Sequence, residues 1–341
     1  MDKKQLIMII DLSGSKISAV AAEVLDDNSV NIIAEESKPA KEIRRGKIAQ
    51  PEETAFSIKE LITKIKNRNG VGEISSIYFS INSKNEPADL REDLEACFSL
   101  TKLPQNLPPY LPAAIESAAA AVLDEGDDRK GCALIHFGHS LTTLAIYAGG
   151  KLQQTLAVPF GGQIITNDII NELNISEANA EKLKRLKGSA LCNMLEKVEI
   201  IKMPSLDVEN PEAQIRTDYL AEIIEARLEE ICKPIFDAIE DSEYKLDAGI
   251  VITGGASKLR NIVEFISEKT GFEEVRRGDH SAWLGEGVDV RFYDPSYSQL
   301  IGAIVLVDEY RKKNPGGGNR KKGKLLDKLK DKVNTLFDDE L

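Results

Sequence analysis

Apolar and polar positions near the start of the chain follow first strand-like and then helix-like patterns. Residues 5–37 contain three apolar runs, the last in VNIIAEES, and predict three strands. PEETAFSIKELITKIKNR has apolar residues at helical spacing after Pro51 and two acids, which predicts an amphipathic helix. EISSIYFSIN then predicts a further strand, and LPAAIESAAAAVL predicts an alanine-rich helix.

The second part of the chain repeats this order of strands followed by helices. Strands are predicted within 132–158, helices around 162–173 and 176–187, and a charged helix near 217–241. AGIVITGGASKLRNIVEFI predicts a strand, a Gly-Gly turn and a helix, and YSQLIGAIVLVDEY predicts a closing helix. Strands followed by helices, twice over, indicate two mixed α/β domains.

Three short glycine turns each follow a buried strand. They are Asp11-Leu-Ser-Gly-Ser-Lys16, His136-Phe-Gly-His-Ser140 and Thr253-Gly-Gly-Ala-Ser257. Glycine permits a tight turn whose exposed backbone N–H groups can bind an anion. In the first turn a lysine could add charge for a phosphate and an aspartate could hold a metal-bound water. An ordinary hairpin explains any one turn equally well, but the three together favour a nucleotide cleft.

Composition limits the classes of protein that fit. The chain has 341 residues, of which 42% are hydrophobic and 29% charged, as in a soluble globular protein. No apolar run reaches the ~18 residues of a membrane span, and the N-terminus lacks the pattern of a signal peptide. The four cysteines have no metal-like spacing, so we expect reduced thiols in a cytoplasmic protein without a metal site. A net charge of −12 argues against nucleic acid as a partner.

The C-terminal segment differs in character from the rest. Pro315 to Asn319 is a glycine-rich linker, and an amphipathic pattern follows it. Lys330 and Lys332 flank the apolar face, whereas Asp327 and Asp331 lie near the opposite side, which suits a helix lying on an anionic membrane. Docking on a protein surface is the alternative. The apolar face consists of Leu325, Leu326, Leu329, Val333, Leu336 and Phe337.

Four longer segments carry a resemblance to a known family. They are PFGGQIITNDI, KLKRLKGSALC, DYLAEIIEARLEEI and DPSYSQLIGAI. With the order of the glycine turns, they resemble the actin-like ATPase superfamily and most closely the bacterial cell-division family FtsA. The resemblance implies an actin-like (ribonuclease H-like) α/β fold of two domains with a nucleotide cleft between them. The implied parts are a first domain over 1–123, a second over 124–310 with a small subdomain about 176–246, a linker over 311–323 and a membrane-targeting helix over 324–337.

The resemblance also implies a set of nucleotide-binding residues. The first phosphate turn supplies Asp11, Ser13, Gly14, Ser15 and Lys16; the second supplies Gly138, His139 and Ser140; a helix N-terminus supplies Gly161 and Gly162; the adenosine turn supplies Gly254, Gly255 and Ala256, with Lys258 nearby. Binding of ATP and Mg²⁺ at these residues stays open at this stage.

The second phosphate turn departs from the family pattern DxGGGTTD. Both acidic positions are lost, to His136 and Thr143, and two glycines are replaced by His139 and Ser140. Magnesium prefers oxygen ligands, so a neutral imidazole is a poor substitute for a carboxylate. We therefore expect weak or absent ATP hydrolysis.

A second departure concerns an inserted subdomain that FtsA proteins carry in the first domain, called 1C. Only the residues from Ser83 to Tyr110 lie at its place, too few for an independent core. In the family this subdomain makes contacts along filaments and with other division proteins, and the resemblance does not extend to those contacts.

The leading hypothesis is a division adaptor at the cytoplasmic face of the inner membrane, at the division site. The resemblance implies that its small subdomain binds the C-terminal peptide of the tubulin-like FtsZ. Lys182, Lys184, Arg185 and Lys187 could pair with that acidic peptide or simply form a solvated helix face. Self-association would strengthen membrane attachment. The alternatives are an active ATPase that forms membrane-bound filaments, and a pilus or secretion adaptor resembling PilM.

Overall fold

A computed structural model of the chain describes residues 6–44, 47–68, 70–81, 94–95, 97, 99–100 and 113–314. The chain divides into one compact unit, Met1–Val307, and a second, Asp308–Leu341. The predicted linker beyond residue 314, the membrane helix and most of Ser83 to Tyr110 lie outside the described residues. In the described part of the chain, no helix combines the length and apolar character that crossing a bilayer requires.

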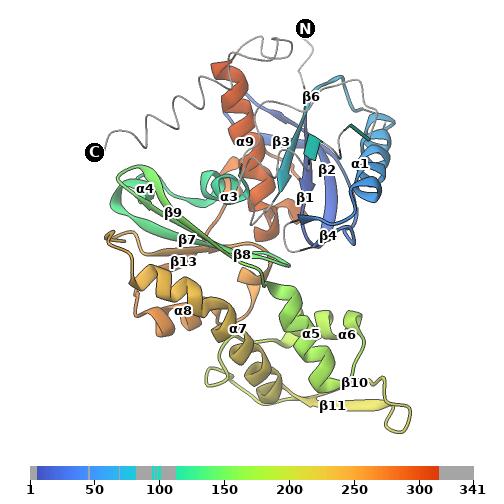
Figure 1. The fold of residues 1–341 in the computed structure, drawn as a ribbon, viewed down its shortest axis with the longest axis vertical. Coiled ribbons are helices and arrows are strands. Elements are labelled where there is room, and N and C mark those ends of the chain that lie inside the picture. The colour runs from blue at the N-terminus through green and yellow to red at the C-terminus, as the bar shows by residue number, and fades with distance from the viewer. Residues whose placement is uncertain are drawn as a thin grey trace. The chain divides into compact units, whose positions relative to one another are not determined.

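The first sheet has four strands in the order β3-β2-β1-β6 (Figure 1). They are β1 (Leu6–Leu12), β2 (Lys16–Val24), β3 (Val30–Pro39) and β6 (Ile74–Ile81). Every residue of β1 is buried, because helices cover both faces of the sheet. Met8 and Ile10 pack with Ile58 of α1 (Pro51–Lys66), whereas Ile7 and Ile9 pack with Ile301 of α9 (Ser298–Lys313). Successive side chains of β1 point to opposite faces of the sheet, and both faces are covered by helices. The strand is therefore apolar at nearly every position.

The second sheet has five strands in the order β13-β12-β7-β8-β9. These are β7 (Cys132–Phe137), β8 (Thr142–Ala148), β9 (Lys151–Val158), β12 (Ile250–Thr253) and β13 (Val275–Arg277). One face packs against α7 (Thr217–Glu240) and α8 (Ile262–Thr270). The other face packs against α3 (Ala114–Val122), whose alanines allow a close approach to Leu134 and Val251.

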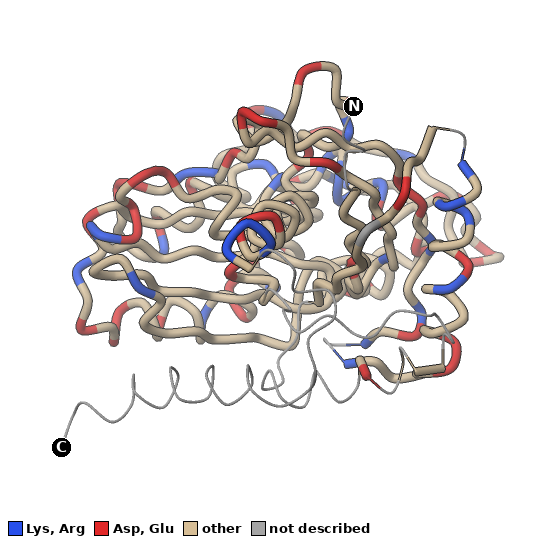
Figure 2. Tube along the Cα trace, turned by 90° about the horizontal axis from the view of Figure 1, so that it is seen from above, with Lys and Arg blue, Asp and Glu red and all other residues tan. Residues whose placement is uncertain are grey.

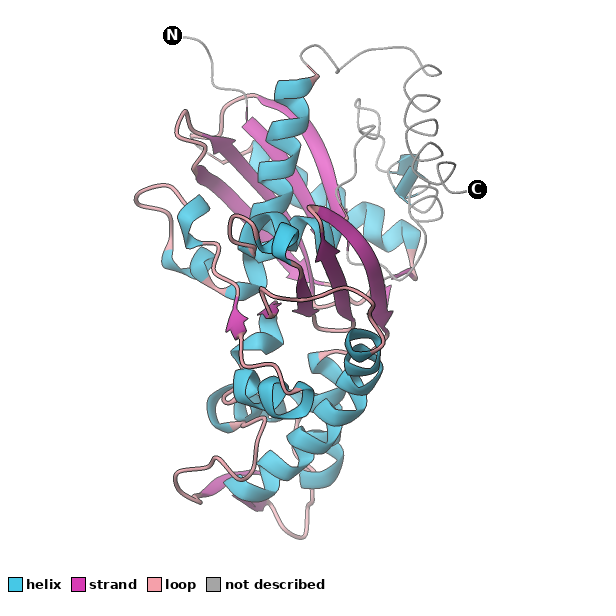
Figure 3. Ribbon diagram, turned by 90° about the vertical axis from the view of Figure 1, so that its left-hand side faces the viewer, coloured by secondary structure: helices cyan, strands magenta, loops and turns pink. Residues whose placement is uncertain are grey.

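A small subdomain of the second domain lies beyond one end of this sheet (Figures 1 and 3). It contains α5 (Gly162–Leu173), α6 (Glu177–Lys187), part of α7 and the hairpin of β10 (Ile200–Pro204) and β11 (Glu212–Arg216). The sequence pattern does not predict this hairpin, because Pro204 ends β10, Pro211 precedes β11, and both strands leave alternate side chains in solvent. The remaining elements are short: β4 (Ile43–Arg44), β5 (Lys47–Ile48), α4 (Asp127–Lys130), and the 3-10 turns η1 (Gly255–Lys258), η2 (Ser281–Trp283), η3 (Val290–Tyr293) and η4 (Pro295–Tyr297).

Two helices each pack on the sheet of the other domain from the one to which the expected boundaries assign them. The boundary at residue 310 assigned α9 to the second domain, but its buried residues pack on the first sheet. Helix α3, assigned to the first domain, packs on the second sheet. The two helices approach closely at Gly302, where an added Cβ would lie 1.7 Å from the carbonyl oxygen of Ser117. Each half of the chain therefore contributes one helix to the sheet of the other half, and the two helices cross at Gly302.

Candidate functional site

The three glycine turns come together at one place, between the two sheets. An ideal Cβ on Gly14 would lie 2.2 Å from Ser140 Oγ, so the first and second turns touch. A Cβ on Gly161 would lie 2.4 Å from the carbonyl oxygen of Gly138, and one on Gly254 would lie 2.4 Å from that of Phe137. The segments singled out in the sequence thus form a single cluster.

Asp11 is the penultimate residue of β1, lies inside this cluster and already accepts a hydrogen bond within the protein. Gln299 Nε2, from the start of α9, donates to Asp11 Oδ1 and to Ser80 Oγ, both at 2.9 Å. Burial raises the pKa of Asp11 to about 7, against the opposing effects of the Lys16 charge and the Gln299 bond. A carboxyl group that is partly protonated near neutral pH is a poor partner for a metal-bound water.

Lys16, the expected phosphate ligand, also has internal partners. Its Nζ donates to Glu35 Oε1 at 3.2 Å and to the Tyr297 hydroxyl at 3.0 Å. Tyr297 donates in turn to Glu35 Oε1 at 3.1 Å, and Arg291 pairs with Glu35 Oε2 at 3.2 Å. The Glu35 side chain is only 3% exposed, so these bonds form in a largely desolvated place. We call Lys16, Glu35, Arg291 and Tyr297 the Glu35 network.

The serines of the first turn support its backbone. Ser13 Oγ donates to the Lys16 carbonyl at 2.8 Å and accepts from the Lys16 N–H at 3.2 Å. Ser15 Oγ lies 3.3 Å from Ser13 Oγ. These hydroxyls close the hairpin on itself.

The second turn lacks the chemistry of a phosphate and metal site. His136 is buried at the end of β7, and burial lowers its pKa to about 4, so the ring is neutral at pH 7. Thr143, which stands at the other acidic position of the family pattern, has a buried hydroxyl without a hydrogen-bond partner. Ser140 fills the space beside Gly14. Neither negative charge nor room for a phosphate is provided here.

The N-terminus of α5 is occupied by the second turn itself. The Gly162 N–H donates to the Gly138 carbonyl at 3.0 Å, and the Gln163 N–H donates to the His139 carbonyl at 2.8 Å. Lys184 Nζ adds bonds to the Gly162 carbonyl at 2.8 Å and to Thr166 Oγ1 at 2.6 Å. These two amides therefore cannot bind an anion without breaking existing bonds.

The expected adenosine turn is tied to its surroundings. Gly254 has a φ of +88°, so any side chain there would be strained as well as crowded by Phe137. Gly255 and Ala256 lie in η1, whose last residue, Lys258, forms an ion pair with Asp294. Thr253 Oγ1 donates to Ser298 Oγ at 2.9 Å, which links the turn to α9.

ATP with Mg²⁺ does not fit this arrangement of residues. The lysines expected near the nucleotide are paired, two amides of the α5 N-terminus are bonded, and the second turn has no carboxylate. Over the part of the chain that the structure describes, no group of three or more His, Cys, Asp or Glu residues converges as metal ligands would.

The basic residues expected to bind a peptide on α6 fall into two groups. Lys182 and Arg185 are exposed, and Lys187 pairs with Glu199 at 2.6 Å across the subdomain surface. Lys184 is buried and bonded internally, so it supports the fold and offers no free charge to a partner. Acidic and basic residues are interspersed along the described trace (Figure 2), and α6 itself carries Glu177 and Glu181 beside its basic residues.

Several apolar side chains of the small subdomain are exposed. Leu186 is 61% exposed, Ile200 on β10 is 65% exposed, and Tyr219 in the first turn of α7 is 42% exposed. The sequence does not distinguish these positions from core positions, because an apolar residue within a helical or strand pattern is expected in the core. Their exposure is visible only once the subdomain is assembled.

Comparison with known proteins adds the family context. The family described as "Cell division protein FtsA" matches residues 133–302. The protein named "Cell division protein FtsA" of Neisseria meningitidis is 25% identical, over 89% of this chain and 90% of its own length. The protein of the same name of Rhizobium meliloti is 32% identical, over 69% of this chain and 52% of its own length.

Solved structures support the fold. MreB5 of Spiroplasma citri bound to ADP has a TM-score of 0.71 at 15% identity, covering 92% of this chain and 99% of that one. A PilM–PilN type IV pilus biogenesis complex contains a chain with a TM-score of 0.59 at 15% identity, covering 92% of this chain and 100% of that one. The two-domain actin-like α/β fold expected from the sequence is confirmed.

Proposed function

We propose that this chain, an FtsA-like protein with the actin-like fold, is a cell-division adaptor that links FtsZ-type filaments to the cytoplasmic membrane without hydrolysing ATP. The observation that carries the proposal is a contrast between two surfaces. Lys16 and two amides of the α5 N-terminus, expected to bind a nucleotide, are bonded within the protein, whereas α6 presents unpaired positive charge beside exposed apolar side chains.

The exposed surface of α6 suits an acidic peptide with apolar residues, such as the FtsZ tail. Lys182 and Arg185 would supply the electrostatic attraction, and Leu186 and Ile200 would supply apolar contact area. Ion pairs at such exposed positions contribute about 0.5 to 1 kcal/mol each. A peptide held in this way binds reversibly, as an adaptor requires.

Attachment to the membrane would come from the C-terminal amphipathic segment at 324–337. Its apolar residues include Leu329 at the centre of the predicted face. Binding through one short helix is reversible, so several copies collected along a filament would hold the membrane more firmly than a single copy. This division of tasks keeps the peptide site and the anchor on separate parts of the chain.

A recruitment experiment tests both tasks at once. A fluorescent peptide with the FtsZ C-terminal sequence is expected to sediment with phosphatidylglycerol liposomes only when the full chain is present. Leu329→Asp should leave protein and peptide in the supernatant, because a charge in the apolar face opposes insertion. The double variant Lys182→Glu/Arg185→Glu should still sediment but should recover about tenfold less peptide.

The control is a double variant with the same charge change at exposed lysines outside the small subdomain, Lys130→Glu/Lys151→Glu. It should recover the peptide like the wild type. Equal peptide recovery by the α6 variant would contradict the peptide site, and equal sedimentation of Leu329→Asp would contradict the anchor. If the chain sedimented with the liposomes but recovered none of the added FtsZ peptide, an adaptor of the PilM kind would be favoured.

ATP with Mg²⁺ at millimolar concentration is expected to leave the thermal midpoint of the protein unchanged and to yield no phosphate. A site with a Kd 100-fold below the ligand concentration would instead stabilise the protein by about 2.7 kcal/mol. Differential scanning fluorimetry and a phosphate-release assay measure the two effects. Micromolar binding together with steady turnover would establish the competing hypothesis, an active ATPase.

The variant Lys16→Met distinguishes two roles of Lys16, support of the fold and binding of a phosphate, in the same assay. It should lower the stability by about 2 kcal/mol without ATP, because the buried Glu35 carboxylate loses a charged donor. Lys41→Met, at an exposed lysine, should have no such effect. If Lys16→Met changed only a response to ATP, the lysine would be a nucleotide ligand.

A further inference from the structure

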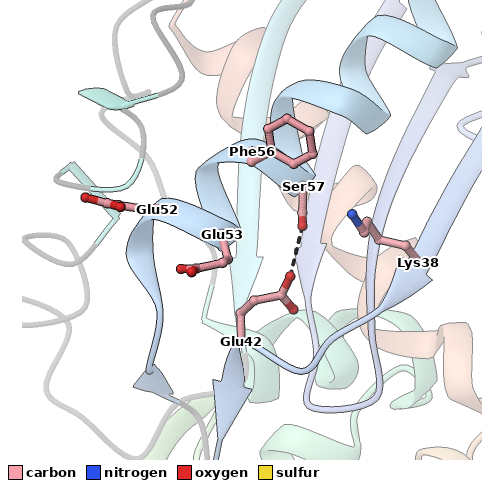
Figure 4. A pocket seen from close by; sticks show the side chains of 6 residues that line it. All are labelled: Lys38, Glu42, Glu52, Glu53, Phe56 and Ser57. Atoms are coloured by element: carbon pink, nitrogen blue, oxygen red, sulfur yellow. Dashed lines mark hydrogen bonds between the residues drawn. The ribbon is translucent and has the colours of Figure 1, made fainter.

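A cavity of about 300 Å³ lies in the first domain, among residues of β3, α1 and the segment that connects them (Figure 4). Lys38 of β3 lines it on one side, and the first two turns of α1 line the other. Glu42, just before β4, lies between them. The full lining is Lys38, Glu42, Glu52, Glu53, Phe56 and Ser57. None of these residues belongs to the glycine turns or to α6.

Glu42 is the unusual residue of this cavity. It is 9% exposed, and its Oε1 accepts a hydrogen bond from Ser57 Oγ at 3.0 Å. Its Oε2 is buried and has no hydrogen-bond partner. Figure 4 shows the carboxylate turned toward the space between Ser57 and Lys38. An acceptor left unsatisfied in this way destabilises the folded state, and a charged acceptor does so more strongly than a neutral one.

The other buried acids of the described chain show how such a group is normally satisfied. Both oxygens of Glu35 are paired, with Lys16 and Arg291, and Asp11 accepts from Gln299. Among these acids of the described structure, Glu42 is the one with a fully buried carboxylate oxygen that has no hydrogen-bond partner. A donor from outside the described chain would remove this cost.

The charges around the cavity favour a cation as that donor. Lys38 is its only basic residue, and Lys38 Nζ is already paired with Glu60 Oε2 at 3.1 Å. Glu52 and Glu53 are explained as favourable charges in the first turn of α1, but they also add negative charge to the rim. The cavity therefore has three carboxylates and no uncommitted cation among its lining residues.

The geometry favours a long organic cation over a metal ion. The carboxylates do not converge as a metal-ligand group within the described residues. Phe56 stands at the opening with 69% of its surface exposed and offers a ring face to an aliphatic stem or a cation. The ring already lies 5.8 Å from Lys38 Nζ, measured to its centroid.

We propose that this cavity binds a lysine or arginine side chain presented by a partner polypeptide. Glu42 Oε2 accepts a hydrogen bond from the cationic group, Glu52 and Glu53 attract it electrostatically, and Phe56 packs along the stem. The occupant is a basic peptide, so this surface differs in charge preference from α6, which suits an acidic one.

Fluorescence anisotropy with a labelled arginine-leucine peptide tests the proposal on the full chain. The matched probe has citrulline in place of each arginine, which keeps the shape and removes the charge. We expect the citrulline peptide to bind at least about tenfold more weakly, since it cannot form the charge-assisted hydrogen bond to Glu42. Glu42→Gln should weaken binding of the arginine peptide to a similar extent, and Phe56→Ala should weaken it several-fold.

Glu73→Gln serves as the control, because it removes an exposed acid of the same domain that does not line the cavity. It should change the peptide affinity less than twofold. Glu42→Gln should also raise the thermal midpoint of the free protein, which separates lost binding from lost folding. Equal affinity of Glu42→Gln and wild type, or of the arginine and citrulline peptides, would overturn the proposal.

Discussion

Gly302→Ala is expected to destabilise the protein by about 3 kcal/mol or more, as severe overpacking does. The new Cβ would lie 1.7 Å from the carbonyl oxygen of Ser117 and 2.6 Å from its carbonyl carbon. Because these are backbone atoms, no side-chain rotation relieves the clash, and α3 and α9 must separate. Urea unfolding followed by circular dichroism measures the loss.

Gly72→Ala is the matched control, since its added Cβ would make an ordinary contact of 3.8 Å with Leu6 Cδ1. It should change stability by less than about 0.5 kcal/mol. Ser117→Ala should not rescue Gly302→Ala, because the obstructing oxygen belongs to the main chain. Equal stability of the two glycine variants would show that the helices do not cross in contact.

Asp11→Asn is expected to stabilise the protein at pH 8 by an amount on the order of 4 kcal/mol. The pKa of Asp11 is raised from 3.8 to about 7, and each unit corresponds to about 1.36 kcal/mol. The folded state therefore holds a proton that the unfolded state has released. The contribution of protonated Asp11 to stability is complete below pH 3.8 and is lost as the pH rises through 7.

Asparagine retains the Oδ1 acceptor for Gln299 and never ionises, so it avoids this loss. The advantage of the variant should therefore shrink between pH 8 and pH 4, measured by urea unfolding at each pH. Asp26→Asn, at an exposed turn, should show no such trend. A neutral or destabilising Asp11→Asn at pH 8 would mean that Asp11 is ionised and used as an anion.

His136 has the opposite effect to Asp11 on the pH dependence of stability between about pH 4 and 6.5. Burial lowers its pKa from 6.5 to about 4, so the unfolded state takes up a proton first and stability is lost as the pH falls from 6.5 to 4. In the wild type this loss offsets the gain from Asp11. The Asp11→Asn variant should therefore lose stability below pH 6.5 more steeply than the wild type.

Local features of the sequence predicted most of the elements, though not the β10–β11 hairpin, and the assembly of the glycine turns. Continuous apolar runs marked β1 and β7 because both strands are buried on both faces. The lost acids at His136 and Thr143 were also visible directly in the sequence. Lys184 could have been recognised as buried, since it follows Ala180 and Leu183 at helical spacing on the buried face of α6.

The partners of Asp11 and Lys16, which the sequence placed in a phosphate turn, could not be predicted. Gln299 lies 288 residues from Asp11, and Tyr297 lies 281 residues from Lys16. No local pattern relates positions so far apart; the pairing arises because α9 returns to the first sheet. The unpaired oxygen of Glu42 was hidden for a similar reason, since its burial depends on the packing of α1 over β3.

The return of α9 to the first sheet also determines when this protein can fold during synthesis. One face of β1, with Ile7 and Ile9, is covered by Leu300, Ile301 and Ile304. A ribosome must therefore release almost the whole compact unit before that face leaves water. Until then the nascent chain exposes an apolar sheet, a state that favours aggregation and attracts chaperones. The N-terminal sheet is thus translated first, but one of its faces is covered only after α9 has been synthesised.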